Sequence, residues 1–463
     1  MANLRILRAC ILTSMILGAS TALSTSASAQ FRADDPGVRG GPAGAGDHLP
    51  GLTTTNPGGS AGGEVAFFEL GKEDFASAED VADGVGPRFN LDSCGGCHAQ
   101  PATGGSSPEV NPQFTLATTG PFDTGNRPPS FITRNGPVRE ARFVKKPDGT
   151  PDGGVHALFV ITGAPGATGC NIRQEDFEAQ VAARNIIFRI PTPVFGAGMI
   201  EAIKDSTLAS NVASNSTAKN QLGISGRLNT NGNDGTVTRF GWKAQNKSLL
   251  IFSGEAYNVE MGITNHNFQQ ERDETTSCQF ANTPNDDQLF DTSAGFPELI
   301  QAIENFANFQ RFLDQPTPVT TSFTTKSGRS VSATSTARGK QVFSAIGCNL
   351  CHTPSLTTSE KQAVAALRSK TANLFSDLAL HNMGAGLADN VAQGAANGNE
   401  FRSAPLWGVG QRIFFLHDGR TDDIQQAIRQ HASQGSEANG VINRFNLLSE
   451  SDQQALFNFL RSL

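Results

Sequence analysis

The sequence lacks the features that mark membrane-spanning and nucleic-acid-binding proteins. Beyond the first 29 residues, no stretch of the 463-residue chain approaches the roughly 18 consecutive apolar residues that a membrane span requires. The chain carries 36 Lys and Arg against 43 Asp and Glu, and a formal net charge of −7 argues against nucleic acid as a partner. It also contains a single tyrosine, Tyr257, which we expect to pack in the core or in a loop. These absences predict a globular protein with neither a membrane span nor a nucleic-acid partner.

Residues 1–29 have the pattern of a signal peptide. Arg5 and Arg8 precede an apolar stretch, and the segment ends in Ala27-Ser28-Ala29, the small-residue pattern that signal peptidase cleaves. A membrane anchor is the alternative, but the apolar stretch is short for a span. We therefore expect a mature protein that begins at Gln30 and is exported to the bacterial periplasm.

Four of the seven cysteines lie in two motifs of the same form, C-x-x-C-H. The first contains Cys94, Cys97 and His98, and the second contains Cys348, Cys351 and His352. This is the attachment sequence of c-type haem, in which two thiols add to the vinyl groups and the adjacent histidine ligates the iron. A single copy could be a redox dithiol or half of a zinc site. Two copies in an exported chain favour two covalently bound haem c groups.

The two other cysteines of the mature chain are Cys170 and Cys278. An oxidising compartment favours a disulfide between them, and two buried free thiols are the alternative. A bridge over a loop of this length would contribute about 4 to 5 kcal/mol in the chain-entropy account of disulfides.

The composition predicts a mainly α-helical fold with long loops. The chain contains 49 Gly and 23 Pro, yet 38% of its residues are hydrophobic, including 31 Phe that supply a core. A weak internal repeat relates residues 193–198 to residues 405–410, and each copy follows one haem motif. We therefore predict two cytochrome c-like haem domains, with a small β-containing insertion in the N-terminal half.

The predicted segments are a signal peptide (1–29), an extended N-terminal arm (30–63), an N-terminal haem c domain with the insertion (64–315) and a C-terminal cytochrome c domain (316–463). The arm is rich in Gly, Pro, Thr and Ala and has almost no apolar periodicity. Within residues 142–190, the stretches 155–161 (VHALFVI) and 185–190 (NIIFRI) predict short strands in the insertion.

Local signals also predict three helices. One should lie around residues 76–83, ahead of the first haem motif, and another over residues 337–346, leading into the second. The third is a C-terminal helix that Ser449 can cap, with apolar residues recurring on one face.

From about Phe67 to its C-terminus, the sequence resembles the dihaem c-type oxidoreductase family, which is related to the bacterial dihaem cytochrome c peroxidases. The segments that carry the resemblance are residues 86–98 (GPRFNLDSCGGCH), 239–244 (RFGWKA), 261–265 (MGITN) and 415–421 (FLHDGRT).

The resemblance implies a second ligand for the C-terminal haem. In the peroxidases this ligand lies fourteen residues after the histidine of a His-Asp-Gly motif, and the same count from His417 reaches His431. Peroxidases generally have methionine there, so His431 implies a bis-histidine iron of lower potential, with His352 on the other side. A surface histidine is the alternative for His431, with His417 as the next candidate ligand and Met383 a further one.

The resemblance also assigns roles to Trp242 and Glu260. Trp242 corresponds to the tryptophan between the two haems of the peroxidases and is the candidate electron relay, although a core tryptophan is nearly as good an interpretation. Glu260 lies in a stretch that resembles the one carrying their distal glutamate, which moves protons during O–O cleavage. The segment in this sequence, residues 258–262 (NVEMG), lacks the proline found in the peroxidases and is one residue shorter. Glu255 and Glu201 are the next candidates, and a solvated surface glutamate is the alternative interpretation of Glu260.

Three functions follow from these residues. The first is a peroxidase-type oxidoreductase that reduces hydrogen peroxide, or another small oxidant, at the His98 haem, with a small cytochrome or cupredoxin as electron donor. The second is a dihaem electron carrier without catalysis, in which Met261, His266 or Met199 is the sixth ligand of the first haem iron. The third is an oxygenase that uses dioxygen. The peroxidases also contain calcium, but no ligand cluster in this sequence is specific enough to carry it over.

Overall fold

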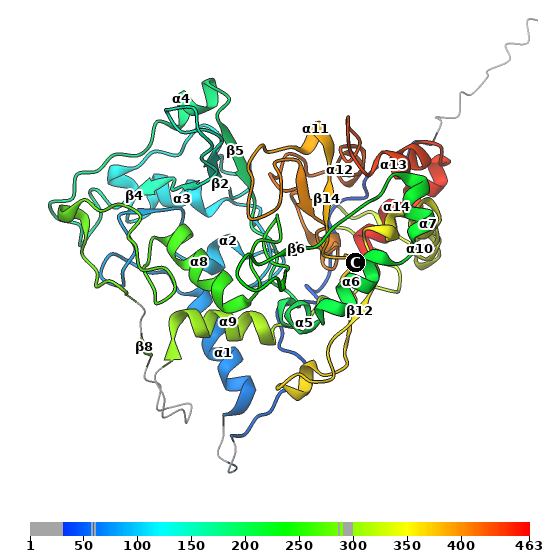
Figure 1. Cartoon of the computed structure of the whole chain (residues 1–463), viewed down its shortest axis with the longest axis horizontal. Coiled ribbons are helices and arrows are strands. Elements are labelled where there is room, and N and C mark those ends of the chain that lie inside the picture. Colours follow the sequence, from blue (N-terminus) through cyan, green and yellow to red (C-terminus); the bar gives the residue numbers. More distant parts are fainter. Residues whose placement is uncertain (1–30, 57–58, 60–61, 286–287, 290–299) are drawn as a thin grey trace, which may run out of the picture. The chain divides into compact units, whose positions relative to one another are not determined.

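The computed structural model describes residues 31–56, 59, 62–285, 288–289 and 300–463 (Figure 1). The chain divides into two units, Met1–Arg32 and Ala33–Leu463. The predicted signal peptide, residues 1–29, lies outside the described residues. Within the described part, no helix is both long enough and apolar enough to cross a membrane.

The second unit is mainly α-helical with small antiparallel sheets, as the sequence predicts. Its helices are α1 (Gly63–Ala76), α2 (Cys94–Cys97), α3 (Pro112–Thr119), α4 (Phe177–Ala182), α5 (Ala197–Ala202), α6 (Asp205–Ala213), α7 (Ser216–Leu222), α8 (Leu249–Met261), α9 (Ala302–Phe312), α10 (Ala333–Ile346), α11 (Gly384–Leu387), α12 (Ile424–Arg429), α13 (Asn439–Asn446) and α14 (Glu450–Ser462). The division into haem domains at residue 315 stays a prediction.

Short strands connect these helices. They are β1 (Arg88–Phe89), β2 (Glu140–Phe143), β3 (Val155–His156), β4 (Phe159–Val160), β5 (Ile186–Arg189), β6 (Asn229–Thr230), β7 (Val237–Thr238), β8 (Gln288–Leu289), β9 (Ile300–Gln301), β10 (Phe323–Thr324), β11 (Ser330–Val331), β12 (Leu356–Thr357), β13 (Thr371–Ala372), β14 (Leu380–Asn382) and β15 (Glu400–Arg402). The largest described sheet has the order β3-β2-β5, and the other described strands pair in twos. The short strands predicted within residues 142–190 are confirmed.

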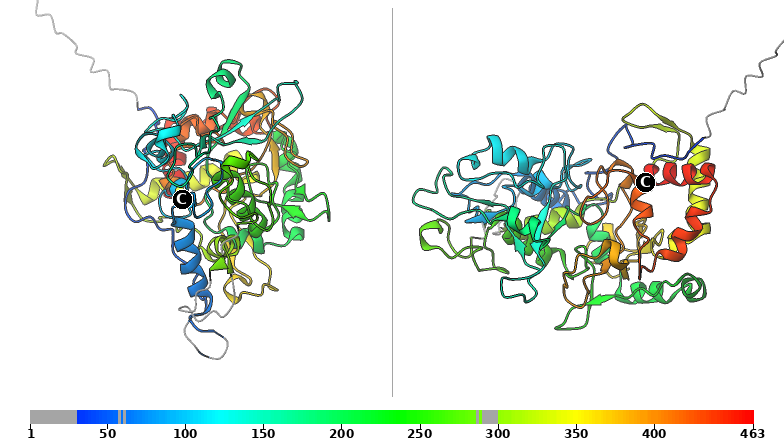
Figure 2. Two further views of the ribbon diagram at one scale, coloured as in Figure 1. Left: turned by 90° about the vertical axis from the view of Figure 1, so that its left-hand side faces the viewer. Right: turned by 90° about the horizontal axis from the view of Figure 1, so that it is seen from above.

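The helix before each C-x-x-C-H motif packs closely against a later helix. In the first pair, a Cβ at Gly71 of α1 would lie 2.2 Å from the Asn305 carbonyl oxygen of α9. In the second pair, a Cβ at Gly339 of α10 would lie 1.9 Å from the Ala455 carbonyl oxygen of α14 (Figure 2). Only glycine allows the two helix backbones to come this close, so one glycine contact of the same kind forms each helix pair.

The internal repeat occupies equivalent places in the two helix pairs. In the first copy, a Cβ added at Gly198 would lie 1.9 Å from the Arg311 carbonyl oxygen of α9. In the second copy, a Cβ added at Gly410 would lie 2.1 Å from the Arg461 carbonyl oxygen of α14. Each copy also has a left-handed glycine two residues earlier. The repeat therefore marks the same structural position twice, which supports two related halves.

The predicted C-terminal helix is present as α14, and the helix predicted over residues 337–346 forms the later part of α10. The Ser449 hydroxyl accepts a hydrogen bond from the backbone N–H of Asp452, as the sequence indicates. The helix predicted over residues 76–83 is wrong, because the helix ahead of the first motif is α1 and ends at Ala76. The reason is local: the Asp80 carboxylate accepts the N–H groups of Ala82 and Asp83, which competes with helix formation.

The predicted disulfide between Cys170 and Cys278 is confirmed, with a Cα–Cα distance of 4.5 Å. The disulfide therefore links the chain that follows β4 to the chain that follows α8, the helix that carries Glu260.

Residues 33–56 form no helix and no strand of a sheet. The Asp35 carboxylate pairs with Arg461 of α14 at 2.6 Å, with side chains 8% and 1% exposed. The Leu49 N–H donates to the Phe312 carbonyl at the end of α9 at 2.7 Å. This extended segment therefore contacts one helix of each pair.

Candidate functional site

The first C-x-x-C-H motif borders a cavity of about 160 Å³. Cys94 and Cys97 lie on α2, where the Ser93 hydroxyl accepts the Gly96 N–H and caps the helix. A Cβ at Gly95 would lie 2.9 Å from the Ala76 Cα, so glycine there lets α1 approach the motif. Both thiols are free and face a common space.

His98 presents one ring nitrogen to this cavity. Its Nδ1 lies 2.9 Å from the Gly105 carbonyl oxygen, and its Nε2 has no hydrogen-bond partner among the described residues. Burial lowers the pKa of His98 to about 4, so the ring is neutral. A neutral imidazole with its Nδ1–H held by a carbonyl leaves the Nε2 lone pair for a metal.

The second motif borders a cavity of about 220 Å³ that also contains His431. The Nδ1 of His352 lies 3.0 Å from the Phe375 carbonyl oxygen, and that of His431 lies 2.8 Å from the Ala427 carbonyl oxygen. Neither Nε2 has a partner among the described residues. His431 lies two residues beyond the end of α12. It lines this cavity, which differs from the surface position of the alternative interpretation. The cavity therefore contains two imidazoles that, like His98, have Nδ1 beside a backbone carbonyl oxygen and Nε2 available for a metal.

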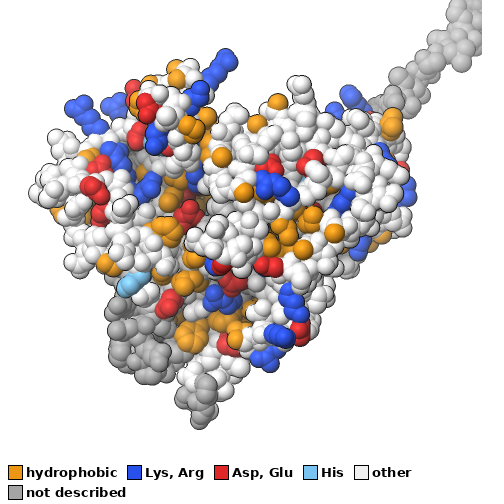
Figure 3. Space-filling model, in the orientation of Figure 1, with side chains coloured by type: hydrophobic (Ala, Val, Ile, Leu, Met, Phe, Trp, Pro, Cys, Tyr) orange, Lys and Arg blue, Asp and Glu red, His pale blue; other side chains and the backbone are white. Residues whose placement is uncertain are grey.

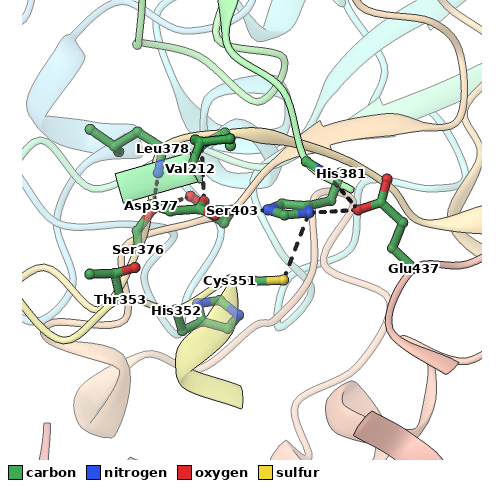
Figure 4. A network of polar contacts seen from close by, with 12 residues as sticks. Val212, Cys351, His352, Thr353, Ser376, Asp377, Leu378, His381, Ser403 and Glu437 are labelled. Carbon is green, nitrogen blue, oxygen red and sulfur yellow. Dashed lines mark hydrogen bonds and ion pairs between the residues drawn. The ribbon is translucent and has the colours of Figure 1, made fainter. Parts of the chain in front are cut away.

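Another histidine of the second cavity has both nitrogens engaged (Figure 4). His381 Nε2 lies 3.0 Å from Asp377 Oδ2, and its Nδ1 lies 2.9 Å from Glu437 Oε2 and 3.7 Å from the Cys351 Sγ. Burial alone would lower the pKa of His381, but the surrounding anionic groups raise it well above its ordinary value. His381 is therefore held as part of the cavity wall, beside the motif.

Trp242 lines both cavities. Its Nε1 donates to the Ile190 carbonyl at 2.9 Å, and the Ile190 N–H donates to the His417 carbonyl at 2.8 Å. The His417 ring meets Trp242 edge to face, with 6.4 Å between centroids, and stacks on Phe401 at 4.3 Å. The indole is therefore fixed between the two motifs, with His417 beside it.

Glu260 lies in the last turn of α8 and lines the first cavity. Its Oε2 accepts from the Asn90 side chain at 2.7 Å, and its carboxyl is also hydrogen-bonded to Glu140. Burial, followed by the charge of Glu140, raises the pKa of Glu260 well above its ordinary value. Burial opposes ionisation of Glu140 too, but its ion pair with Arg142 outweighs this and lowers its pKa. The shared proton therefore resides on Glu260.

The other predicted acids differ in position. Glu255 lines the first cavity and accepts a hydrogen bond from the Asn246 side chain. Glu201 lies outside the cavity lining, where its carboxylate pairs with Arg311 at 2.9 Å. Among the alternative ligands of the first iron, Met261 lines the cavity with its sulfur 3.7 Å from the Cys94 sulfur, whereas Met199 and His266 do not. Met383 lines the second cavity.

Sequence analysis missed Glu140 and Arg142. Both side chains lie on the same face of β2 because they are two residues apart, and both line the first cavity. The signal was an acid and a base alternating with apolar residues in a strand of the insertion. Tyr257 is 2% exposed and packs edge to face on Phe306, as expected of a core residue.

Residues 146–463 match the family described as "Di-haem oxidoreductase, putative peroxidase". The match spans more than half of the sequence. The chain belongs to this dihaem oxidoreductase family. A solved structure titled as a MauG-like protein associated with microbial copper homeostasis is 18% identical, over 59% of this chain and 90% of that one, with a TM-score of 0.28. No curated protein sequence matches the chain.

The two cavities fit the two haems that a dihaem oxidoreductase needs. Each combines a C-x-x-C-H motif whose cysteines form no disulfide with a histidine whose Nε2 has no partner among the residues that the structure describes. The walls around the second motif are largely aliphatic and aromatic, as a porphyrin face requires. Both donor sets thus suit haem iron.

Proposed function

We propose that this chain is an exported dihaem c-type oxidoreductase of the peroxidase type, which reduces hydrogen peroxide in the first cavity with electrons that arrive through the second. Cys94, Cys97 and His98 would hold one haem. Cys348, Cys351, His352 and His431 would hold the other. The observation that carries the proposal is that the two cavities, both lined by Trp242, differ in what faces the motif: acidic side chains in the first and a histidine in the second.

The acidic side chains suit the proton requirement of peroxide reduction. Conversion of hydrogen peroxide to two waters consumes two protons and two electrons, and one oxygen loses a proton while the other gains one as the O–O bond breaks. The haem iron supplies the electron chemistry of this reaction when it is bound. Glu260 would deliver that proton, because its raised pKa keeps it protonated at neutral pH, and the charge of neighbouring Glu140 helps to raise that pKa.

The second cavity suits storage and delivery of an electron. His352 and His431 offer two Nε2 atoms that would both bind the iron, so this haem would transfer electrons and would not bind peroxide. Trp242 borders this space and the first cavity, and is therefore the proposed relay between them.

The carrier alternative rests on Met261, the one alternative ligand of the first iron that lines its cavity. In that case both irons would be six-coordinate and peroxide would not react. The oxygenase alternative has less support, because Arg142, Arg189 and Glu140 surround the first cavity with charge where an apolar substrate would need an apolar channel.

The electron donor of the proposal is a small cytochrome or a cupredoxin. The face drawn in Figure 3 carries acidic and basic side chains intermixed, with no continuous area of one sign. Export is checked separately by the N-terminal sequence of the purified mature protein, which should begin at Gln30.

The first test is electron paramagnetic resonance of the oxidised mature protein, before and after hydrogen peroxide is added. We expect one high-spin and one low-spin haem, with loss of the high-spin signal on addition of peroxide. Two low-spin haem signals that do not change when peroxide is added, in both the oxidised and the half-reduced protein, would contradict the proposed peroxidase function. They would support the electron-carrier function.

A further inference from the structure

Two buried arginines line the second cavity and have no carboxylate partner in the described part of the chain. Arg402 ends β15 and Arg412 follows the 3-10 turn Val409–Gln411, and these residues are 7% and 8% exposed. Other buried arginines are paired, among them Arg189 with Asp389 and Arg461 with Asp35. Arg39 also lacks a carboxylate partner among the described residues, but it donates to the Gln411 side chain and lines neither cavity.

The hydrogen bonds of the two guanidinium groups leave most of their N–H groups unused. Arg402 donates from Nη1 to the Arg239 carbonyl at 3.2 Å, and its Nε is buried without a partner. The Arg412 guanidinium makes no hydrogen bond or ion pair with any described residue. Burial lowers the pKa of both side chains to about 10, so each stays charged at neutral pH.

The cavity itself offers no free anion to these two charges. Glu437 is the single carboxylate among its described lining residues. That carboxylate already accepts hydrogen bonds from His381, from the Ser225 hydroxyl at 2.7 Å and from the Gly226 N–H at 3.0 Å. An unpaired charge in a largely apolar space is strongly unfavourable, so the two arginines require an anionic group from a ligand.

We propose that Arg402 and Arg412 bind the two propionate carboxylates of the haem in the second cavity. The inference rests on the proposed function, because it requires a haem at the second motif. Arginine suits this role because its planar guanidinium stays charged and binds carboxylates through paired N–H groups. A small free carboxylate is the other source of the same chemistry, and the tests below separate the two.

The backbone of Arg402 is joined to the residue that lines both cavities. Its N–H donates to the Trp242 carbonyl at 2.9 Å. An Arg402 side chain that holds the haem of the second cavity would therefore extend from the strand that is hydrogen-bonded to the proposed relay.

The main test uses the variants R402M and R412M, made in the full exported protein. Methionine keeps an unbranched side chain and removes the charge. The control R338M removes the same charge from an exposed side chain of the C-terminal half, where Arg338 pairs with Asp452. Haem content is measured first, from the pyridine haemochrome spectrum, followed by the midpoint potential of the low-spin haem across the neutral pH range.

We expect wild type and R338M to share one nearly flat pH profile. In R402M and R412M the unpaired propionate should bind a proton more readily, and more so when the iron is reduced, so the midpoint potential should fall as the pH rises. Haem present in both variants with the wild-type profile would overturn the inference alone. A wild-type protein without haem on peptide 348–352 would contradict the proposed function, and the inference with it.

A second measurement does not depend on these variants loading haem. Haem labelled with ¹³C at its propionate carboxylates is incorporated into the wild-type protein and into R402K, and infrared difference spectra are recorded on reduction. We expect labelled bands of ionised carboxylate that shift between wild type and R402K. Either of two results would show that the arginines do not bind the propionates and that they bind a small free carboxylate instead. One is a labelled band of a protonated acid at neutral pH, and the other is labelled bands at the same frequency in wild type and R402K.

Discussion

The two cavities share a framework and differ in a few side chains. In each, a glycine lets the preceding helix touch a later one, a phenylalanine four residues after that glycine lies near the motif histidine, and that histidine donates its Nδ1–H to a backbone carbonyl. The first cavity faces its motif with Glu260 and Glu140, and the second with His431. Similar scaffolds can therefore serve unlike chemistry when only the opposing residues change.

The largest expected effect comes from making the second cavity like the first. Replacing His431 with leucine should remove the second axial ligand and convert the second haem from low spin to high spin, while the haem stays covalently attached. Electron paramagnetic resonance and a haem stain of the denatured protein measure the two properties. The exposed His266 gives the matched control H266L, and a low-spin signal that survives in H431L would remove His431 from the ligand set.

Making the first cavity less acidic should slow its reaction. Glu260→Gln should reduce the rate of reaction with hydrogen peroxide by about a hundredfold or more, because the proton donor is lost. Stopped-flow absorbance measures this rate. Glu255→Gln is the matched comparison within the same cavity, and a normal rate in E260Q beside a slow one in E255Q would transfer the role to Glu255.

The shared framework can be tested by its stability. Gly71→Ala and Gly339→Ala each force a Cβ against a backbone carbonyl, and such overpacking should cost about 1 to 3 kcal/mol in the free energy of unfolding. Urea denaturation followed by circular dichroism measures the loss. Gly232→Ala, where an added Cβ has open space, serves as the control. A loss in only one of the two variants would show that the helix pairs are not equivalent.

The smallest effect concerns pH. Because the pKa of Glu260 is raised, its proton is present at neutral pH, and peroxide reduction should decline as the pH rises through that pKa. Glu140→Gln removes a neighbouring negative charge and should lower the pKa of Glu260, moving this decline to lower pH by about one unit. The pH profile of the peroxide rate in E140Q measures the shift, and an unchanged profile would show that the two carboxyls do not share a proton.

The residues that sequence analysis identified are those with local signals. The C-x-x-C-H motifs, the strands of the insertion and the capped C-terminal helix depend on neighbours in the chain, and the disulfide depends on composition and compartment. The first helix was misplaced because the Asp80 carboxylate competes for backbone N–H groups, which apolar patterning does not reveal.

The rest of the site depends on contacts between distant segments. Glu140 meets Glu260 across 120 positions of the chain, and nothing near either residue in the sequence indicates the pairing. Arg402 and Arg412 read as ordinary surface charges until their burial and missing carboxylates are seen. One repeated signal, Gly-Lys-x-x-Phe beginning at Gly71 and at Gly339, was available in the sequence and would have strengthened the case for two related halves.

The extended segment ahead of α1 has a consequence for the order of folding. Its ion pair between Asp35 and Arg461 joins positions 426 residues apart, whereas each helix pair closes a shorter loop. Contacts between such distant positions form late, because the entropy of closing the loop must be overcome first. The two helix pairs should therefore assemble before this segment binds across them, so that its arrival neutralises a buried arginine and completes the native state.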